Sequence, residues 1–391
     1  MSTTYDAVVV GGGPAGATAA TDLARAGHSV ALLDRAGRIK PCGGAVPPRL
    51  LRDFEIPRRL LCAQIDAARI VSPSQRMVDM PIEGGFVGMV DRGVFDEFLR
   101  ERAAEAGAVR TTGRYTRIER PERGPLEVHY TDAEGAPRAL RAKMVVGADG
   151  ALSRVASQEV LGGAEVPYVF AYHEVIRAPA SGDYGPRRCD VVYDGKVSPD
   201  FYGWIFPHGA TASVGTGSAH KGFSLRQSVA ALRATHGLAE AETVRREGAP
   251  IPMRPLKRWD NGRDVVLAGD AAGVVAPASG EGIYYAMLGG RRAAEAVTKA
   301  LETADGRALA GARKAFMKEH GRVFWILGMM QRFWYRDDKR RERFVSMCKD
   351  PDVQALTWQA YMNKELVRAR PAAHVRIFFK DMAHLLGFVA P

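Results

Sequence analysis

Three glycines near the start of the chain have the spacing of a phosphate-binding turn. Gly11, Gly13 and Gly16 lie in "GGGPAG", directly after the apolar run "DAVVV" at 6–10 and just before the amphipathic stretch 17–27. In such a turn the first glycine allows a tight bend, the second lets the backbone approach a pyrophosphate, and the third lets a helix pack closely on a strand. The first N–H groups of that helix then offer hydrogen bonds and a positive dipole end to the phosphates. The unit predicts a bound dinucleotide.

A carboxylate follows at the distance that ribose binding requires. The run "SVALLD" at 29–34 ends on Asp34, about 20 residues after the glycines, where an acid accepts hydrogen bonds from a ribose diol. The sequence therefore predicts that the glycine turn and the end of this strand bind the dinucleotide together. The residues concerned are Gly11, Gly13, Pro14, Ala15, Gly16, Asp34 and Arg35.

Two later stretches favour FAD as that dinucleotide. "MVVGADGALSRVA" at 144–156 and "DVVLAGDAAGVVAPASGEGIYYAM" at 264–287 each run from an apolar strand into a turn of glycine and aspartate, and the second turn opens a helix. With the glycine turn they resemble the FAD enzymes of the para-hydroxybenzoate hydroxylase type, a superfamily of flavin monooxygenases and reductases. The resemblance implies that 144–156 lies near the pyrophosphate and the nicotinamide donor, and that 264–287 holds the ribitol chain and points helix N–H groups at the flavin. The residues so assigned are Asp149, Gly150, Asp270, Gly280, Gly282 and Ile283.

Motif content and charge limit the partners. The sequence has no second unit of strand, GxGxxG and helix, so NADPH is expected to bind transiently beside FAD as the hydride donor. The four cysteines lie far apart without a CxxC pair, which is typical of a reduced, cytoplasmic protein, and no metal site is expected. The net charge of +11 suits an anionic membrane face or a diphosphate, whereas no nucleic-acid module is found and no such partner is expected. The sequence leaves the oligomeric state open.

Hydrophobic patterning divides the chain into three kinds of segment. We expect an α/β fold in which a Rossmann-type FAD-binding domain is interrupted by an antiparallel-sheet substrate domain and followed by a C-terminal helical region. Short alternating stretches separated by Gly, Pro and Asp turns indicate the inserted sheet. The expected division is 1–67, 91–160 and 261–310 for the FAD-binding domain, 68–90 and 161–260 for the substrate domain, and 311–391 for the helical region.

Three local motifs narrow the family. "YGWIFP" at 202–207 fits a YxWxFP signature, "KPCGGAVPPRLL" at 40–51 contains a Cys-Gly-Gly segment, and "VDRGVFDEFL" at 90–99 carries an arginine. Together they resemble the geranylgeranyl reductase family, in particular its bacteriochlorophyll-type branch in phototrophic bacteria, over essentially the whole chain. The resemblance implies contacts to the cofactor by Cys42, Gly43, Gly44 and Arg92, and contacts to a prenyl substrate by Tyr202, Trp204 and Phe206.

This family implies an oxidoreductase that uses FAD and NADPH to reduce the isolated double bonds of a geranylgeranyl chain to phytyl in bacteriochlorophyll biosynthesis. The sequence leaves open whether that chain is carried as the free diphosphate or as the pigment ester. Two alternatives share the same FAD motifs. One is a flavin monooxygenase of the hydroxylase type, and the other is a prenyl- or pigment-binding flavoprotein without catalysis.

The stretch "FYGWIFP" at 201–207 has two interpretations. Aromatic residues are typical of a buried strand, but ring faces also suit the wall of a dry prenyl pocket, where they bury apolar surface and stabilise developing positive charge. An isolated alkene is expected to need a proton as well as a hydride. The candidate catalytic residues are Cys42, Tyr202 and Trp204, with a bound water as an alternative proton donor. His208 is expected to be a surface residue at the end of a strand.

The stretch 374–391 carries an apolar stripe at helical spacing. We expect this stripe to contact the protein core, to cap the prenyl tunnel or to rest on an anionic lipid surface, in which case the protein is peripheral on the cytoplasmic face of the membrane. No apolar run reaches the roughly 20 residues of a spanning helix. The residues of the stripe are Phe378, Met382, Leu385, Leu386 and Val389.

Overall fold

The computed structural model describes residues 3–35, 40–180 and 182–364. The chain groups into two compact units. The first contains Met1–Cys42, Arg92–Tyr168 and Pro250–Phe324, and the second contains Gly43–Asp91, Val169–Ala249 and Trp325–Pro391. Within the described ranges, no helix is both long and apolar enough to cross a membrane. The stripe from Phe378 to Val389 that the sequence predicts lies outside the described residues.

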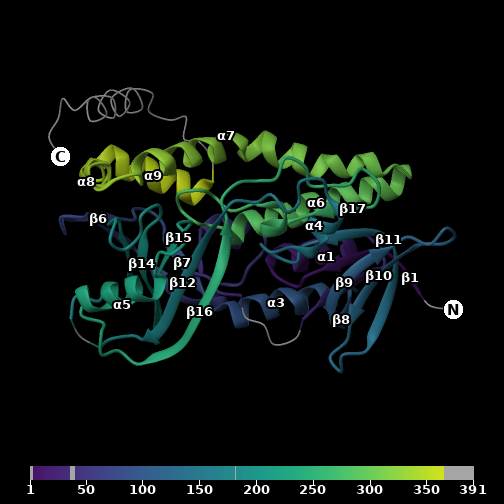
Figure 1. Ribbon diagram of the computed structural model, residues 1–391, viewed down its shortest axis with the longest axis horizontal. Coiled ribbons are helices and arrows are strands. Elements are labelled where there is room, and N and C mark those ends of the chain that lie inside the picture. The colour runs from purple at the N-terminus through teal and green to yellow at the C-terminus, as the bar shows by residue number, and fades with distance from the viewer. Residues whose placement is uncertain (1–2, 36–39, 181, 365–391) are drawn as a thin grey trace. The chain divides into compact units, whose positions relative to one another are not determined.

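A seven-stranded mixed sheet forms the centre of the first unit (Figure 1). Strands β8, β2, β1, β11 and β17 run parallel to one another, and β10 and β9 extend the sheet antiparallel from β11. The middle of β1 is apolar and fully buried, as expected for a strand covered on both faces. The bounds are β1 Thr4–Val10, β2 Val30–Asp34, β8 Val109–Thr112, β9 Arg114–Glu119, β10 Leu126–Thr131, β11 Pro137–Gly147 and β17 Val265–Leu267.

Helix α1 packs on this sheet and against both α3 and α6. The contact between α1 and α6 requires glycine, because a Cβ at Gly290 would lie 2.1 Å from the backbone oxygen of Ala15. The two helices therefore meet backbone to backbone. The bounds are α1 Pro14–Arg25, α3 Arg92–Glu105, α4 Arg154–Glu159, η2 Gly269–Ala272, α6 Ile283–Thr303, η3 Gly306–Ala310 and α7 Gly311–Trp334, which contributes residues to both units.

The second unit contains a larger sheet with the strand order β16-β12-β15-β14-β13-β5-β6 and a small sheet with the order β3-β7-β4. From β12 to β6 the neighbouring strands pair antiparallel, except that β13 and β5 are parallel. The bounds are β3 Ala45–Val46, β4 Leu61–Ile65, β5 Ala67–Val71, β6 Met77–Pro81, β7 Val87–Val90, β12 Tyr168–Arg177, β13 Arg188–Val192, β14 Gly203–His208, β15 Thr211–Ser218 and β16 Thr243–Pro252.

Helix α5 (Leu225–Thr235) covers one face of the larger sheet (Figure 1). Its Val229 and Leu232 are buried against Ile205 of β14 and Val214 of β15. Short helices complete the unit: α2 Pro48–Asp53, η1 Arg58–Leu60, α8 Asp338–Met347 and α9 Pro351–Asn363. The predicted fold class is confirmed: a Rossmann-type α/β unit, an antiparallel sheet and helices toward the C-terminus.

Candidate functional site

Four of the predicted cofactor residues follow the carboxyl ends of neighbouring parallel strands. Val10 of β1 is in register with Leu33 of β2 and with Gly147 of β11, and Gly147 is in register with Leu267 of β17. Shortly after these positions come Gly11, Asp34, Asp149 and Asp270. Open α/β sheets bind their ligands at this edge. The register therefore brings all three sequence motifs to one edge of the sheet.

The glycine turn packs tightly against backbone atoms at Gly11 and Gly16, but it leaves open space beside Gly13 at the start of α1. A Cβ at Gly11 (φ +105°) would lie 2.3 Å from the backbone oxygen of Ala148, and a Cβ at Gly16 would lie 1.8 Å from that of Gly11. Gly13, in contrast, has nothing within 4 Å of the Cβ that it lacks. No side chain caps the N-terminus of α1, where Pro14 is the first helical residue. This open space beside helix N–H groups fits a pyrophosphate.

Asp34 lies against the glycine turn. A Cβ at Gly12 would lie 2.5 Å from Asp34 Oδ2. Arg100 Nη1 of α3 lies 3.3 Å from the carbonyl oxygen of Gly12 and 3.5 Å from Asp34 Oδ2. Asp34 is half-buried, whereas the neighbouring Arg35 is exposed. The sequence reasoning missed Arg100, because no motif marks it and only the fold brings α3 to this turn.

Asp270 lies next to the start of α6. It is 8% exposed and forms an ion pair with Lys40, a second residue that sequence reasoning missed. Asp270 Oδ1 lies 3.8 Å from the position that a Cβ on Gly282 would take. Gly282 is the N-cap of α6 and supplies no side-chain cap, so the helix N–H groups lie beside the carboxylate. Gly280 (φ +66°) and Ile283 complete the turn into the helix. A carboxylate acceptor beside the N–H donors of a helix N-terminus fits the ribitol hydroxyls and the pyrimidine edge of a flavin.

Asp149 organises the turn from β11 into α4. Its Oδ2 accepts hydrogen bonds from the backbone N–H groups of Arg154, at 2.7 Å, and Val155, at 3.2 Å, and Ser153 donates its hydroxyl to Oδ1. Burial nevertheless raises the pKa of Asp149. Gly150 has φ +90°, a conformation that favours glycine. Contact of Asp149 and Gly150 with the cofactor stays a prediction.

The first unit brings Cys42 and Arg92 together. Arg92, at the start of α3, is 4% exposed, and its Nε and Nη2 donate to the two carboxylate oxygens of Asp96 at 2.7 and 2.6 Å. Burial opposes the charge on Arg92, but Asp96 and the Cys42 side chain outweigh it and raise the pKa of Arg92. The bidentate pair fixes the orientation of the guanidinium. Cys42 therefore lies beside a fixed cation.

Gly43 and Gly44 belong to the second unit, where they lie beside β14. A Cβ at Gly43 would lie 3.2 Å from the Phe206 ring. A Cβ at Gly44 (φ +73°) would lie 2.6 Å from both His208 Nε2 and the backbone oxygen of Val90. The surface position predicted for His208 is wrong. His208 ends β14 as expected, but its ring fills the space that Gly44 leaves, and burial lowers the pKa of the imidazole.

The predicted substrate residues form a row of rings. Trp204 and Phe206 alternate with other residues along β14 and share one face, and Tyr202 comes two residues before Trp204. The ring centroids are 6.1 Å apart for Tyr202 and Trp204, and 6.3 Å apart for Trp204 and Phe206. The indole crosses β15 at Gly215, where a Cβ would lie 2.3 Å from Trp204 Cζ2. The stretch thus forms a buried strand, and its role as a pocket wall stays a prediction.

A buried polar chain holds the Trp204 indole. Trp204 Nε1–H donates to Ser213 Oγ at 3.0 Å, and Ser213 Oγ lies 2.8 Å from His173 Nδ1. His173 Nε2 lies 3.1 Å from a carboxylate oxygen of Glu247. Burial opposes the charge on Glu247, but His173 and Arg245 outweigh it and lower the pKa of Glu247. Sequence reasoning did not find this chain.

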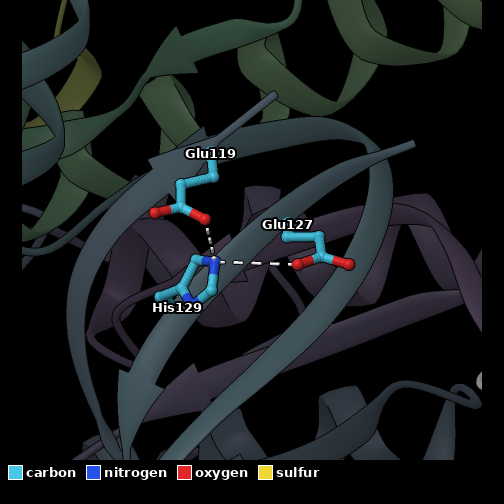
Figure 2. Close-up of side chains that lie close together, drawn as sticks. All are labelled: Glu119, Glu127 and His129. Carbon is cyan, nitrogen blue, oxygen red and sulfur yellow. Dashed lines mark ion pairs between the residues drawn. The ribbon is translucent and has the colours of Figure 1, made fainter. Parts of the chain in front are cut away.

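The one group of potential metal ligands among the described residues lies on β9 and β10 (Figure 2). His129 Nε2 lies 3.1 Å from Glu119 Oε2 and 3.7 Å from Glu127 Oε2. Each carboxylate is also paired with a guanidinium, Glu119 with Arg117 at 2.7 Å and Glu127 with Arg141 at 3.0 Å. The two arginines offset the repulsion of two glutamates that face each other across the strands. We interpret the group as an ion-pair network.

Comparison with known proteins identifies relatives along the whole chain. The chain matches the family described as FAD binding domain over residues 4–171, and the family described as Lycopene cyclase protein over residues 219–381. It is 57% identical over 388 residues to a geranylgeranyl diphosphate reductase of Rhodobacter capsulatus, covering 99% of each chain. It is 36% identical to a chloroplastic geranylgeranyl diphosphate reductase of Oryza sativa, covering 98% of this chain and 86% of the other.

Solved structures show the same fold. A geranylgeranyl bacteriochlorophyll reductase-like protein from Thermoplasma acidophilum aligns with a TM-score of 0.83 at 23% sequence identity. The alignment covers 95% of this chain and 100% of that one. At this identity the likeness concerns the fold alone.

We predict that Asp270→Ala weakens FAD binding, because the ribitol hydroxyls lose a buried acceptor. Such a loss costs about 1–3 kcal/mol, which corresponds to a dissociation constant about 5- to 150-fold higher. Titration of the apoprotein with FAD measures it. Asp305→Ala, which removes an aspartate that caps η3 in the same unit, is the control. An Asp270→Ala protein with wild-type FAD affinity would remove Asp270 from the cofactor site.

We predict that Ser213→Ala destabilises the protein, because it leaves the Trp204 N–H and His173 without a common buried partner. The cost expected for such groups is about 1–3 kcal/mol in the free energy of unfolding. Denaturant unfolding followed by tryptophan fluorescence measures it.

Ser228→Ala is the matched control for this serine. Ser228 Oγ donates to the carbonyl oxygen of Val197 at 2.6 Å, but that oxygen also accepts a hydrogen bond from Thr216 Oγ1 at 2.9 Å. The control therefore leaves the carbonyl paired and costs less. Equal losses in the free energy of unfolding for Ser213→Ala and Ser228→Ala would show that the hydrogen bonds of Ser213 stabilise the protein no more than that of Ser228.

Proposed function

Because the chain belongs to the geranylgeranyl diphosphate reductase family, we propose that it uses FAD and NADPH to reduce the isolated double bonds of a geranylgeranyl chain to phytyl. Full-length similarity to the Rhodobacter enzyme carries this proposal. The name of that relative favours geranylgeranyl diphosphate over the pigment ester as substrate. The product would serve bacteriochlorophyll biosynthesis.

The carboxyl edge of the first sheet would hold the cofactor. FAD, when bound, would pass hydride from NADPH to the alkene. The α1 N-terminus at Gly13 would bind the pyrophosphate, Asp34 the adenosine ribose, and Asp270 the ribitol chain. The start of α6 at Gly282 would offer N–H groups where the flavin ring gains negative charge on reduction. Lys40 pairs with Asp270 Oδ2, so the ribitol hydroxyls would donate to Oδ1, the oxygen beside Gly282.

The row of rings on β14 would bind the prenyl chain. Reduction of an isolated alkene adds one proton and one hydride across the double bond, and positive charge develops on the more substituted carbon. Water would capture that charge, whereas the ring faces of Trp204 and Phe206 stabilise it and exclude water. The Ser213 hydroxyl and Gly215 fix the plane of the indole, since one binds its N–H and the other leaves room for the ring.

Cys42 is our candidate for the proton donor. Its side chain interacts with the guanidinium of Arg92, which the bidentate pair with Asp96 holds in place. Solvent or another acid would then return the proton. A Cys42→Ser enzyme that reduces the prenyl chain at the wild-type rate would transfer the role to Tyr202 or to a bound water.

We also propose that the protein works in the cytoplasm and contacts an anionic membrane face. The net charge of +11 and the apolar stripe within residues 374–391 support this contact. Co-sedimentation with phosphatidylglycerol vesicles tests it. Binding that survives deletion of residues 374–391 would assign the contact to another surface.

An anaerobic assay tests the function. Purified FAD-loaded protein is incubated with NADPH and geranylgeranyl diphosphate without oxygen, and the prenyl products are analysed by mass spectrometry. A reductase yields products that carry successive added pairs of hydrogens. A monooxygenase stalls until oxygen is admitted, and a flavoprotein without catalysis leaves the prenyl chain unchanged. Either of the last two results would overturn the proposal.

We predict that Trp204→Phe shifts the products toward partly reduced chains. The prenyl chain must move between successive reductions, and a smaller ring that lacks the N–H would hold it in place less well. Phenylalanine suits this test better than alanine. Trp204 is only 6% exposed, so truncation to alanine would cost about 3–5 kcal/mol of stability. Product analysis is compared with a thermal melt. A lower melting temperature with an unchanged product ratio would give Trp204 a purely structural role.

A further inference from the structure

The first unit contains a cleft of about 600 Å³, and five of the ten described residues that line it are cations. One wall is the segment before β17, and the other is the first half of α7. Basic residues on both walls line it: Lys257, Arg258, Arg313, Lys314 and Lys318. This volume lies within the range of small-ligand sites. None of these residues belongs to the cofactor or substrate residues proposed above.

The cations of the cleft differ from those around them in lacking carboxylate partners. Within the part of the chain that the structure describes, no carboxylate lies within 4.0 Å of a side-chain nitrogen of Lys257, Arg258, Lys314 or Lys318. Neighbouring arginines are paired: Arg263 with Asp264 at 3.4 Å, and Arg292 of α6 with Glu319 at 3.0 Å. Glu319, which follows Lys318 in the chain, is thus paired with an arginine of α6.

Among the described residues that line the cleft, Asp260 is the only acid, so one negative charge stands against five positive ones. Asp260 Oδ1 accepts a hydrogen bond from the Gly262 N–H at 2.9 Å and so supports the turn before β17. No lysine or arginine among the described residues lies within ion-pair distance of Asp260. The lining therefore keeps a strong positive excess.

The like charges of the cleft repel one another at a small cost in stability, which a bound anion would offset. Lys314 and Lys318 are four residues apart on α7, and like charges at that spacing destabilise a helix. Arg313 Nε donates to the backbone oxygen of Leu256 at 3.0 Å, so one cation is held against the opposite wall. A concave surface of one charge concentrates its field and attracts counter-ions. Lysine and arginine together are the usual ligands of phosphate groups.

We propose that this cleft binds a phosphate-bearing ligand. The phosphate comes either from a soluble molecule with adjacent phosphates or from the headgroup of an anionic lipid. The ammonium groups of α7 and the cations at 257–258 bind its oxygens from the two walls. The site is independent of the proposed reduction, since it requires neither FAD nor a prenyl chain.

Isothermal titration of the FAD-loaded protein with inorganic pyrophosphate at low salt tests the proposal. The double variant Lys314→Gln/Lys318→Gln is expected to weaken binding about tenfold or more, because two charge-assisted contacts are lost. The control Lys143→Gln/Lys299→Gln removes two exposed lysines of the same unit that are paired with Asp6 and Glu302, and it should bind within about twofold of wild type. This control variant loses the same two positive charges as the cleft variant.

A second arm identifies the source of the phosphate. The same proteins are co-sedimented with phosphatidylglycerol vesicles and with phosphatidylcholine vesicles. A loss confined to pyrophosphate assigns a soluble ligand, and a parallel loss on phosphatidylglycerol assigns a lipid headgroup. If the α7 variant does not fold, Lys257→Gln/Arg258→Gln on the other wall takes its place. No binding of pyrophosphate or phosphatidylglycerol by wild type, or equal binding by the cleft and control variants, overturns the proposal.

Discussion

The parallel register of β1, β11 and β17 is the constraint on which the candidate cofactor site depends. Val10, Gly147 and Leu267 lie at one level across the sheet, so the three turns that follow them open at the same edge. Motifs that are more than 100 residues apart in the chain thereby supply one site. The close contact of Gly290 with the backbone of Ala15 then sets α6 directly against α1, which places two helix N-termini with positive dipole ends at that edge.

The second unit depends on a comparable close approach. Gly215 leaves the space in which the Trp204 indole crosses β15, and Ser213, two residues earlier on the same face, binds the indole N–H. The ring is thus held by shape on one side and by a hydrogen bond on the other. His173 and Glu247 continue the chain through strands that are distant in sequence. In the proposed reaction, a ring held in this way would exclude water and keep its place while the prenyl chain moves.

The sequence was most informative where a residue type has a single physical use. Gly11, Gly13 and Gly16 predicted the turn because their roles follow from the absence of a side chain, and the aromatic residues of "FYGWIFP" indicated the buried strand that is β14. Lys40 and Arg100 could not be found in this way, since surface cations occur throughout the chain.

Contacts that depend on the pairing of strands also could not be predicted from the sequence. His173, Ser213 and Glu247 meet only because β12, β15 and β16 pair in a particular order, and His208 is covered because Gly44 returns beside β14. The proposed reduction is tested most directly by mixing the chemically reduced, FAD-loaded protein with geranylgeranyl diphosphate in an oxygen-free stopped-flow cell. A geranylgeranyl reductase restores the absorbance of oxidised flavin as it reduces the prenyl chain. Flavin that stays reduced until oxygen is admitted would rule out this activity.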